Sequence, residues 1–214
     1  MQVDNNYNNY NNYKVNFGAR RIMSAEKVVD GLSEKFEVYK LDYMDIPFAE
    51  KLAIYMKNQK HKLNDVQKKL YYHLKDFVTH QEHFDVKKAT STQNDLYIGI
   101  KNDEEISGYM LLKNSKFGQN HNRKYEIEEI CPNTKDKITE DTFRYTFFAD
   151  KGLNNHFRFT LRTRFYKNKD FLIGREYKNK TKAIIRKEYP DYKFQISTKS
   201  DYCDLEDVLG IAEL

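Results

Sequence analysis

Hydrophobic and polar residues alternate in several short runs of the chain, and this period of two is typical of β-strands. The pattern is found in Phe36–Leu41, Leu96–Ile100, Ile106–Lys113, Lys124–Ile130 and Tyr192–Ser197. A polar turn separates the second run from the third, which predicts a β-hairpin.

Other stretches repeat their apolar residues at steps of three and four, which predicts amphipathic helices. The predicted helices cover about residues 25–33, 48–56, 64–83, 140–150 and 174–189. Ser24, Asn64 and Thr139 precede three of them and are expected as N-caps. Strands and helices mixed in this way predict one α+β domain, with a mostly antiparallel central sheet flanked by helices.

One alternating segment, Phe157 to Tyr166, also indicates chemistry. Its apolar residues share one face of the predicted strand, and its arginines share the other. This basic face predicts an anion site, and the alternative is a solvated face whose arginines pair with nearby acids. Basic residues continue beyond the strand, so the candidate nucleic-acid or partner-binding residues are Arg158, Arg162, Arg164, Lys167, Lys169, Arg175, Lys178, Lys182 and Arg186.

Charge is distributed unevenly along the 214 residues, whose overall net charge is +5. Residues 155–199 contain 13 Lys or Arg and four Asp or Glu, whereas residues 200–214 contain five acids and no base. We expect the acidic tail to fold back and shield the basic segment, and the alternative is that both bind partners.

Composition also predicts the organisation and location of the protein. We expect a flexible Asn/Tyr-rich leader over residues 1–21, one domain over 22–199 and an acidic tail over 200–214. No run approaches the ~20 apolar residues of a membrane span, so no membrane partner is expected. Two distant cysteines and the lack of a secretory signal predict a cytoplasmic protein. His80, His83 and Asp85 have no second ligand cluster, so no metal is predicted.

The order of predicted elements from Phe36 to Ser197 resembles the fold of the GNAT acyltransferases. Gly99 to Leu112 looks like their central hairpin, and Lys124 to Ile130 looks like the strand before their cofactor loop. The resemblance implies acetyl-CoA as cofactor and a base and an acid beside it. The matching positions are Glu128 or Glu129 for the base, Tyr189 or Tyr192 for the acid, and Lys135 and Lys137 for the cofactor.

The stretch that corresponds to the GNAT cofactor loop, residues 133–139, contains no glycine. Glycine lets the backbone of such a loop approach a pyrophosphate closely at a helix start. We therefore expect a degenerate GNAT-like scaffold that needs no cofactor.

The basic face carries interleaved Tyr and Phe, a combination that favours binding to nucleic acid. We therefore expect a non-catalytic protein that binds nucleic acid or a host nucleoprotein. The composition is similar to that of phage and plasmid anti-defence inhibitors, a class that includes anti-CRISPR proteins. The alternatives are an acetyl-CoA-dependent N-acyltransferase and a metal-dependent nuclease, the latter built on Lys124, Glu126, Glu128 and Glu129.

Overall fold

The chain folds into helices packed on both sides of one antiparallel sheet. The computed structural model describes residues 19–41, 45–59, 61–82, 93–102, 105–117, 122–133, 137–151, 158–160, 171–173, 183–197, 202–203, 205 and 209. Its labelled elements are β1 (Ala19–Val29), β2 (Leu32–Leu41), α1 (Ile46–Asn58), α2 (Asp65–Glu82), β3 (Gln93–Lys101), β4 (Glu105–Phe117), β5 (Asn122–Pro132), α3 (Lys137–Lys151), β6 (Arg158–Thr160), β7 (Phe171–Ile173), β8 (Lys193–Ile196) and β9 (Tyr202–Cys203).

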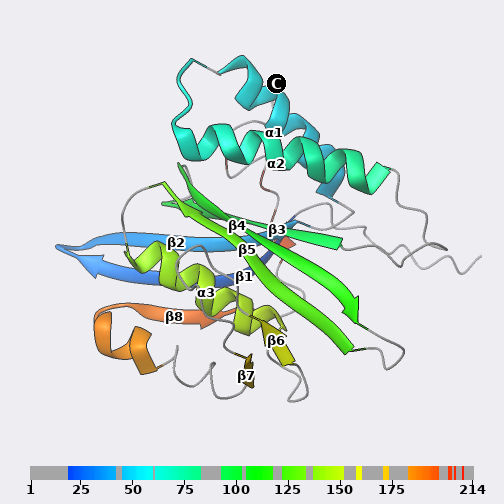
Figure 1. Cartoon of the computed structure of the whole chain (residues 1–214). Coiled ribbons are helices and arrows are strands. Elements are labelled where there is room, and N and C mark those ends of the chain that lie inside the picture. Colours follow the sequence, from blue (N-terminus) through cyan, green and yellow to red (C-terminus); the bar gives the residue numbers. More distant parts are fainter. Residues whose placement is uncertain are drawn as a thin grey trace, which may run out of the picture.

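The central sheet has the strand order β5-β4-β3-β2-β1-β8, and the short β9 also pairs with β1. Every pairing within it is antiparallel. Figure 1 shows α1 and α2 together on one side of this sheet and α3 on the other. The predicted α+β class, with a mostly antiparallel sheet flanked by helices, is therefore confirmed.

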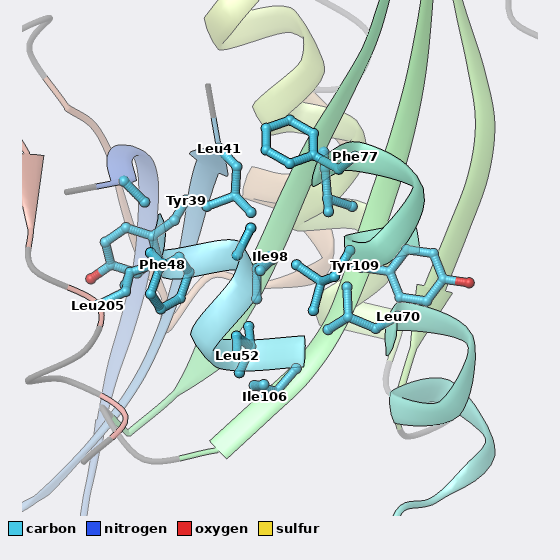
Figure 2. Close-up of a cluster of buried hydrophobic side chains, with 14 of the residues drawn as sticks. Tyr39, Leu41, Phe48, Leu52, Leu70, Phe77, Ile98, Ile106, Tyr109 and Leu205 are labelled. Atoms are coloured by element: carbon cyan, nitrogen blue, oxygen red, sulfur yellow. The ribbon is translucent and has the colours of Figure 1, made fainter. Parts of the chain in front are cut away.

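Both faces of the sheet are buried, which explains the nearly continuous apolar sequences of β3 and β4. One face packs against α1 and α2, in a cluster that we call the α1–α2 cluster (Figure 2). The other face packs against α3 in the α3 cluster, which also buries Ile185 of a helical segment at residues 183–188. Side chains on neighbouring positions of one strand thus lie in different layers.

The predicted helix at 25–33 is wrong, because these residues form the β1–β2 hairpin. Asp30 and Gly31 have φ angles of 51° and 81°, and Val29 pairs with Leu32 across them. Two successive positive φ angles in a two-residue loop are characteristic of the type I′ turn, for which Asp-Gly is a favoured sequence. The strand begins at Ala19, so the last residues of the predicted leader already belong to the sheet.

Other predicted boundaries have mixed outcomes. Asn64 caps α2 as expected, through a capping box with Gln67 in which each side chain accepts a hydrogen bond from the other residue's backbone N–H. Thr139 is not the cap of α3, because the helix already begins at Lys137 and Thr139 is buried. The described part of the predicted arginine strand is only β6, which pairs with β7 in a separate two-stranded sheet.

Two glycines on adjacent strands provide room for an aromatic side chain of α3. Gly99 of β3 and Gly108 of β4 are register partners. A Cβ at Gly99 would come within 2.8 Å of the rings of Phe143 and Phe36, and one at Gly108 within 3.2 Å of Phe143. Phe143 is fully buried, and its ring meets that of Phe36 edge-on, with centroids 5.8 Å apart. The glycine pair is thus required by the packing of α3 on the sheet.

Described residues of the acidic tail attach to the sheet and the core. Tyr202 and Cys203 pair with the start of β1, and Leu205 is buried in the α1–α2 cluster, as Figure 2 shows. Helix 183–188, which carries Arg186, contributes to the α3 cluster on the opposite face. All five acids of the tail and most of the basic segment lie outside the described residues, so the expectation that the tail shields the basic segment stays a prediction.

Candidate nucleic-acid interface

The structure describes two of the nine predicted basic binding residues. Arg158 begins β6, and Arg186 is exposed on the helix at residues 183–188. The following predicted residues lie outside the described part of the chain: Arg162, Arg164, Lys167, Lys169, Arg175, Lys178 and Lys182. The site can therefore be built from Arg186 and its surroundings.

Four aromatic side chains lie in a row beside Arg186, and we call this row the aromatic ladder. Its members are Tyr145 of α3, Phe194 of β8, and Tyr192 and Tyr189 of the segment between helix 183–188 and β8. Successive ring centroids are 6.4, 6.2 and 6.0 Å apart, and two of the three contacts are edge-to-face. Such contacts stabilise aromatic pairs beyond the area that they bury. The ladder thus forms a rigid surface built from elements that are distant in sequence.

The ladder is half-buried. Tyr145 is buried, whereas Tyr189, Tyr192 and Phe194 each keep part of their surface in contact with solvent. The three partly exposed rings pack against the α3 cluster, which holds them in place from below. A ring that is fixed on one side and open on the other can stack against a flat ligand with little loss of conformational entropy.

Two cations act on rings of the ladder. The Lys27 Nζ of β1 lies 5.5 Å from the ring centroid of Tyr192, within the range of a cation–π interaction. Burial raises the pKa of Tyr145, and the positive charge of Arg186 partly opposes that rise. Arg186 itself is exposed on helix 183–188, which directly precedes Tyr189.

Acidic groups fix the frame around the ladder. The Tyr192 hydroxyl donates to Glu34 Oε2 at 3.3 Å, and the Tyr189 hydroxyl donates to Asp141 Oδ2 at 3.3 Å. A hydrogen bond from Lys101 is the main cause that lowers the pKa of Glu34, so this carboxylate is ionised at neutral pH.

Lys137, the predicted cofactor contact, forms an ion pair with Glu188. Lys135 lies outside the described residues.

The sheet separates Glu129, one of the two predicted bases, from both predicted acids. Glu129 lies on the face that packs against α2, whereas Tyr189 and Tyr192 pack against the α3 cluster on the opposite face. Glu128, the other candidate base, is exposed beside a β-bulge in the β4–β5 pairing. The acid–base pairing of Glu129 with Tyr189 or Tyr192 is therefore wrong.

Glu129 is instead the centre of a polar contact between α2 and the sheet. Its carboxylate accepts a hydrogen bond from the Tyr109 hydroxyl at 2.8 Å, and it lies 3.0 Å from Lys69 Nζ and 3.3 Å from His73 Nε2. Sequence reasoning did not connect these residues. The spacing of Lys69 and His73, which places both on one flank of α2, was the available signal.

Burial and hydrogen bonding act in opposite directions on this contact. Burial alone would raise the pKa of Glu129, but hydrogen bonds from Tyr109 and Lys69 outweigh it and lower the pKa. Burial, together with the hydrogen bond to Glu129, raises the pKa of Tyr109. The contact therefore consists of an ionised carboxylate and a neutral phenol at neutral pH.

Replacing Glu129 should change how stability depends on pH. A carboxylate with a lowered pKa stabilises the fold above its ordinary pKa, and this contribution is lost as the pH falls through its pKa in the folded state. We expect Glu129→Gln to lower stability at neutral pH by about 1 kcal/mol and to flatten the acid limb of a pH–stability profile.

Glu128→Gln is the matched control for this measurement, because Glu128 is the exposed neighbour on the same strand. Urea unfolding of both variants across the acid range gives the comparison. Parallel acid limbs for Glu129→Gln and the wild type would contradict the role that we assign to the contact.

The described residues contain no group of three or more His, Cys, Asp or Glu side chains that could hold a metal ion. His83 and Asp85 lie outside that part of the chain. The side chains of His80, Lys124 and Glu126 are also outside the description. None of the helices in the described segments combines the length and hydropathy that a membrane span requires.

Comparison with known proteins finds no matching family and no matching curated protein.

Proposed function

We propose that this protein binds single-stranded nucleic acid through the aromatic ladder and the cations beside it, without a cofactor and without catalysis. The observation that carries the proposal is the set of fixed, half-exposed rings with Lys27 over Tyr192 and the exposed Arg186 on the adjoining helix 183–188. Single-strand binding proteins combine the same two features, aromatic platforms for bases and cations for phosphates.

The sequence next to the ladder supports this assignment. Residues 174–182 lead directly into helix 183–188, and they contain Arg175, Lys178, Lys180 and Lys182. The high positive charge of this segment favours contacts with phosphates. Phosphate contacts of this kind supply affinity that is independent of sequence and sensitive to salt.

The proposal extends to the setting in which such binding operates. Occupying the nucleic acid of a host nucleoprotein is one way to inhibit it, and an anti-defence role of the anti-CRISPR type is the setting that we propose. A cytoplasmic location belongs to the same proposal, because nucleoproteins of this kind act there.

The expected result of Tyr192→Ala is a roughly tenfold weaker affinity for a short labelled single-stranded oligonucleotide, measured by fluorescence anisotropy. One stacked base contributes about 1–3 kcal/mol, which corresponds to a factor of about 5 to 150. Tyr192→Phe keeps the ring and removes only the hydroxyl that contacts Glu34, so it should bind like the wild type.

Arg186→Ala should weaken binding for all sequences and reduce the salt slope by about one.

Lys193→Ala is the control for Arg186→Ala. Lys193 is exposed and adjoins two ladder residues, but strand alternation directs its side chain to the face opposite Phe194. Thermal midpoints of all variants separate lost binding from lost folding. Equal affinities and equal salt slopes in wild type, Tyr192→Ala and Arg186→Ala would refute the ladder as the interface.

A further inference from the structure

A second surface feature lies on the other side of the sheet, between α1 and α2. It is a cavity of about 80 Å³. Its lining consists of Met56 and Lys57 from the end of α1, Leu63 from the connecting loop, and Lys68, Tyr71 and Tyr72 from α2. The aromatic ladder packs on the α3 side, so the two sites are separated by the sheet.

The cavity has apolar walls and an exposed aromatic edge. The rings of Tyr71 and Tyr72 meet at an interplanar angle of 62° with centroids 5.4 Å apart, and Lys75 Nζ lies 5.8 Å from the Tyr71 ring centroid. Tyr72 is 63% exposed. An exposed tyrosine over an apolar hollow is typical of binding hot spots, since the ring contributes a large contact area at low entropic cost.

The volume of the cavity restricts what can enter it. A dry cavity of about 150 Å³ holds a benzene ring. A cavity of about 80 Å³ is therefore too small for a nucleobase or an aromatic side chain, but it accepts part of a branched aliphatic side chain. Nucleic acid contains no aliphatic group of this kind, so the size indicates a protein ligand.

The charge around the cavity indicates the character of that ligand. Residues 46–82 contain seven Lys and four Asp or Glu. Lys57 and Lys68 line the cavity itself, and the ion pair of Lys68 with Asp65, at 3.2 Å, is exposed. Exposed pairs of this kind are weak, so an incoming carboxylate can replace Asp65 as the partner of Lys68.

We propose that the α1–α2 cavity docks an acidic peptide segment of a partner protein, which inserts a leucine or isoleucine between Met56, Leu63 and Tyr72. Its carboxylates pair with Lys57 and Lys68. An apolar anchor between acidic residues is complementary to this lining in both shape and charge. The inference does not depend on the nucleic-acid interface, because the two sites share no residue.

The test titrates the full chain with a short synthetic peptide of Asp and Glu that contains one central leucine, followed by amide NMR spectra and calorimetry. The expected result is shifts confined to residues around 56–72. Affinity should fall roughly tenfold when the peptide leucine is replaced by alanine, and again roughly tenfold for the protein variant Tyr72→Ala. Tyr72 is mostly exposed, so this variant should keep the thermal midpoint of the wild type.

Two further variants complete the test. The double variant Lys57→Glu, Lys68→Glu should lose peptide binding, whereas Ile54→Ala should not, because Ile54 is 58% exposed on α1 and does not line the cavity. The proposal would be overturned if the peptide affinity stays unchanged when the peptide leucine is replaced by alanine, or when the protein carries Tyr72→Ala. A second result would also overturn it. If the peptide never binds, and an oligonucleotide loses its affinity in the double lysine variant, nucleic acid would be the occupant.

Discussion

Gly108→Ala is expected to destabilise the fold by about 3 kcal/mol, one of the two largest effects among the substitutions considered for this protein. Gly108 has a φ of 157°, which an L-residue rarely adopts. An added Cβ would lie 2.7 Å from the carbonyl oxygen of Cys131 and 2.9 Å from the Cα of Pro132. These are backbone atoms of a paired strand, so they cannot move aside without breaking the β4–β5 ladder.

Two other glycines separate the causes of this effect. Gly31→Ala imposes only the strain of a positive φ, because nothing lies within 4 Å of its added Cβ, and it should cost about 1 kcal/mol. Gly99→Ala imposes only a clash, with ring atoms of Phe36 and Phe143, and should cost about 2 kcal/mol. The urea midpoint should therefore be highest for Gly31→Ala, lower for Gly99→Ala and lowest for Gly108→Ala. A Gly108→Ala midpoint no lower than that of Gly31→Ala would show that the glycine pair is not needed for packing.

Leu205→Ala should also lower the free energy of unfolding by about 3 kcal/mol. Leu205 is 1% exposed and belongs to the α1–α2 cluster, so alanine would leave a cavity beneath α1. Removing residues 200–214 should cost at least as much, because it also removes the pairing of β9 with β1. Chemical unfolding of both proteins gives the comparison.

Leu32→Ala provides the control, since Leu32 is 76% exposed at the β1–β2 turn and its loss should cost less than about 0.5 kcal/mol. The competing hypothesis is an electrostatic shield. It predicts that the truncated protein keeps its stability and binds nucleic acid more tightly. That result would remove the structural role that we assign to the tail.

Local signals in the sequence predicted much of the fold. Strand alternation located β3 and β4, and the Asn64 cap located the start of α2. The first hairpin is different, because the helical spacing after Ser24 competes with the turn signal of Asp30-Gly31. The β-branched pair Val28-Val29 before that turn favours a strand, and the hairpin is the outcome in the structure.

The candidate site was harder to predict because its members are distant in sequence. Position in the sequence predicts Tyr189 and Tyr192 as catalytic acids. Charge predicts Arg186 as a binding residue. Their packing partner Tyr145 lies on a different helix, and Lys27 lies on a strand that had been predicted as a helix. No local pattern connects these residues, since the antiparallel pairing of β1 with β8 and the packing of α3 bring them together.

The pairings of β1 have a consequence for synthesis of the protein on the ribosome. This strand is made early, yet two of its hydrogen-bonded neighbours, β8 and β9, come from the far end of the chain. Contacts between such distant residues form slowly and late in folding. One edge of β1 therefore stays unpaired until β8 and β9 have been made, and an unpaired strand edge is a template for strand-to-strand aggregation.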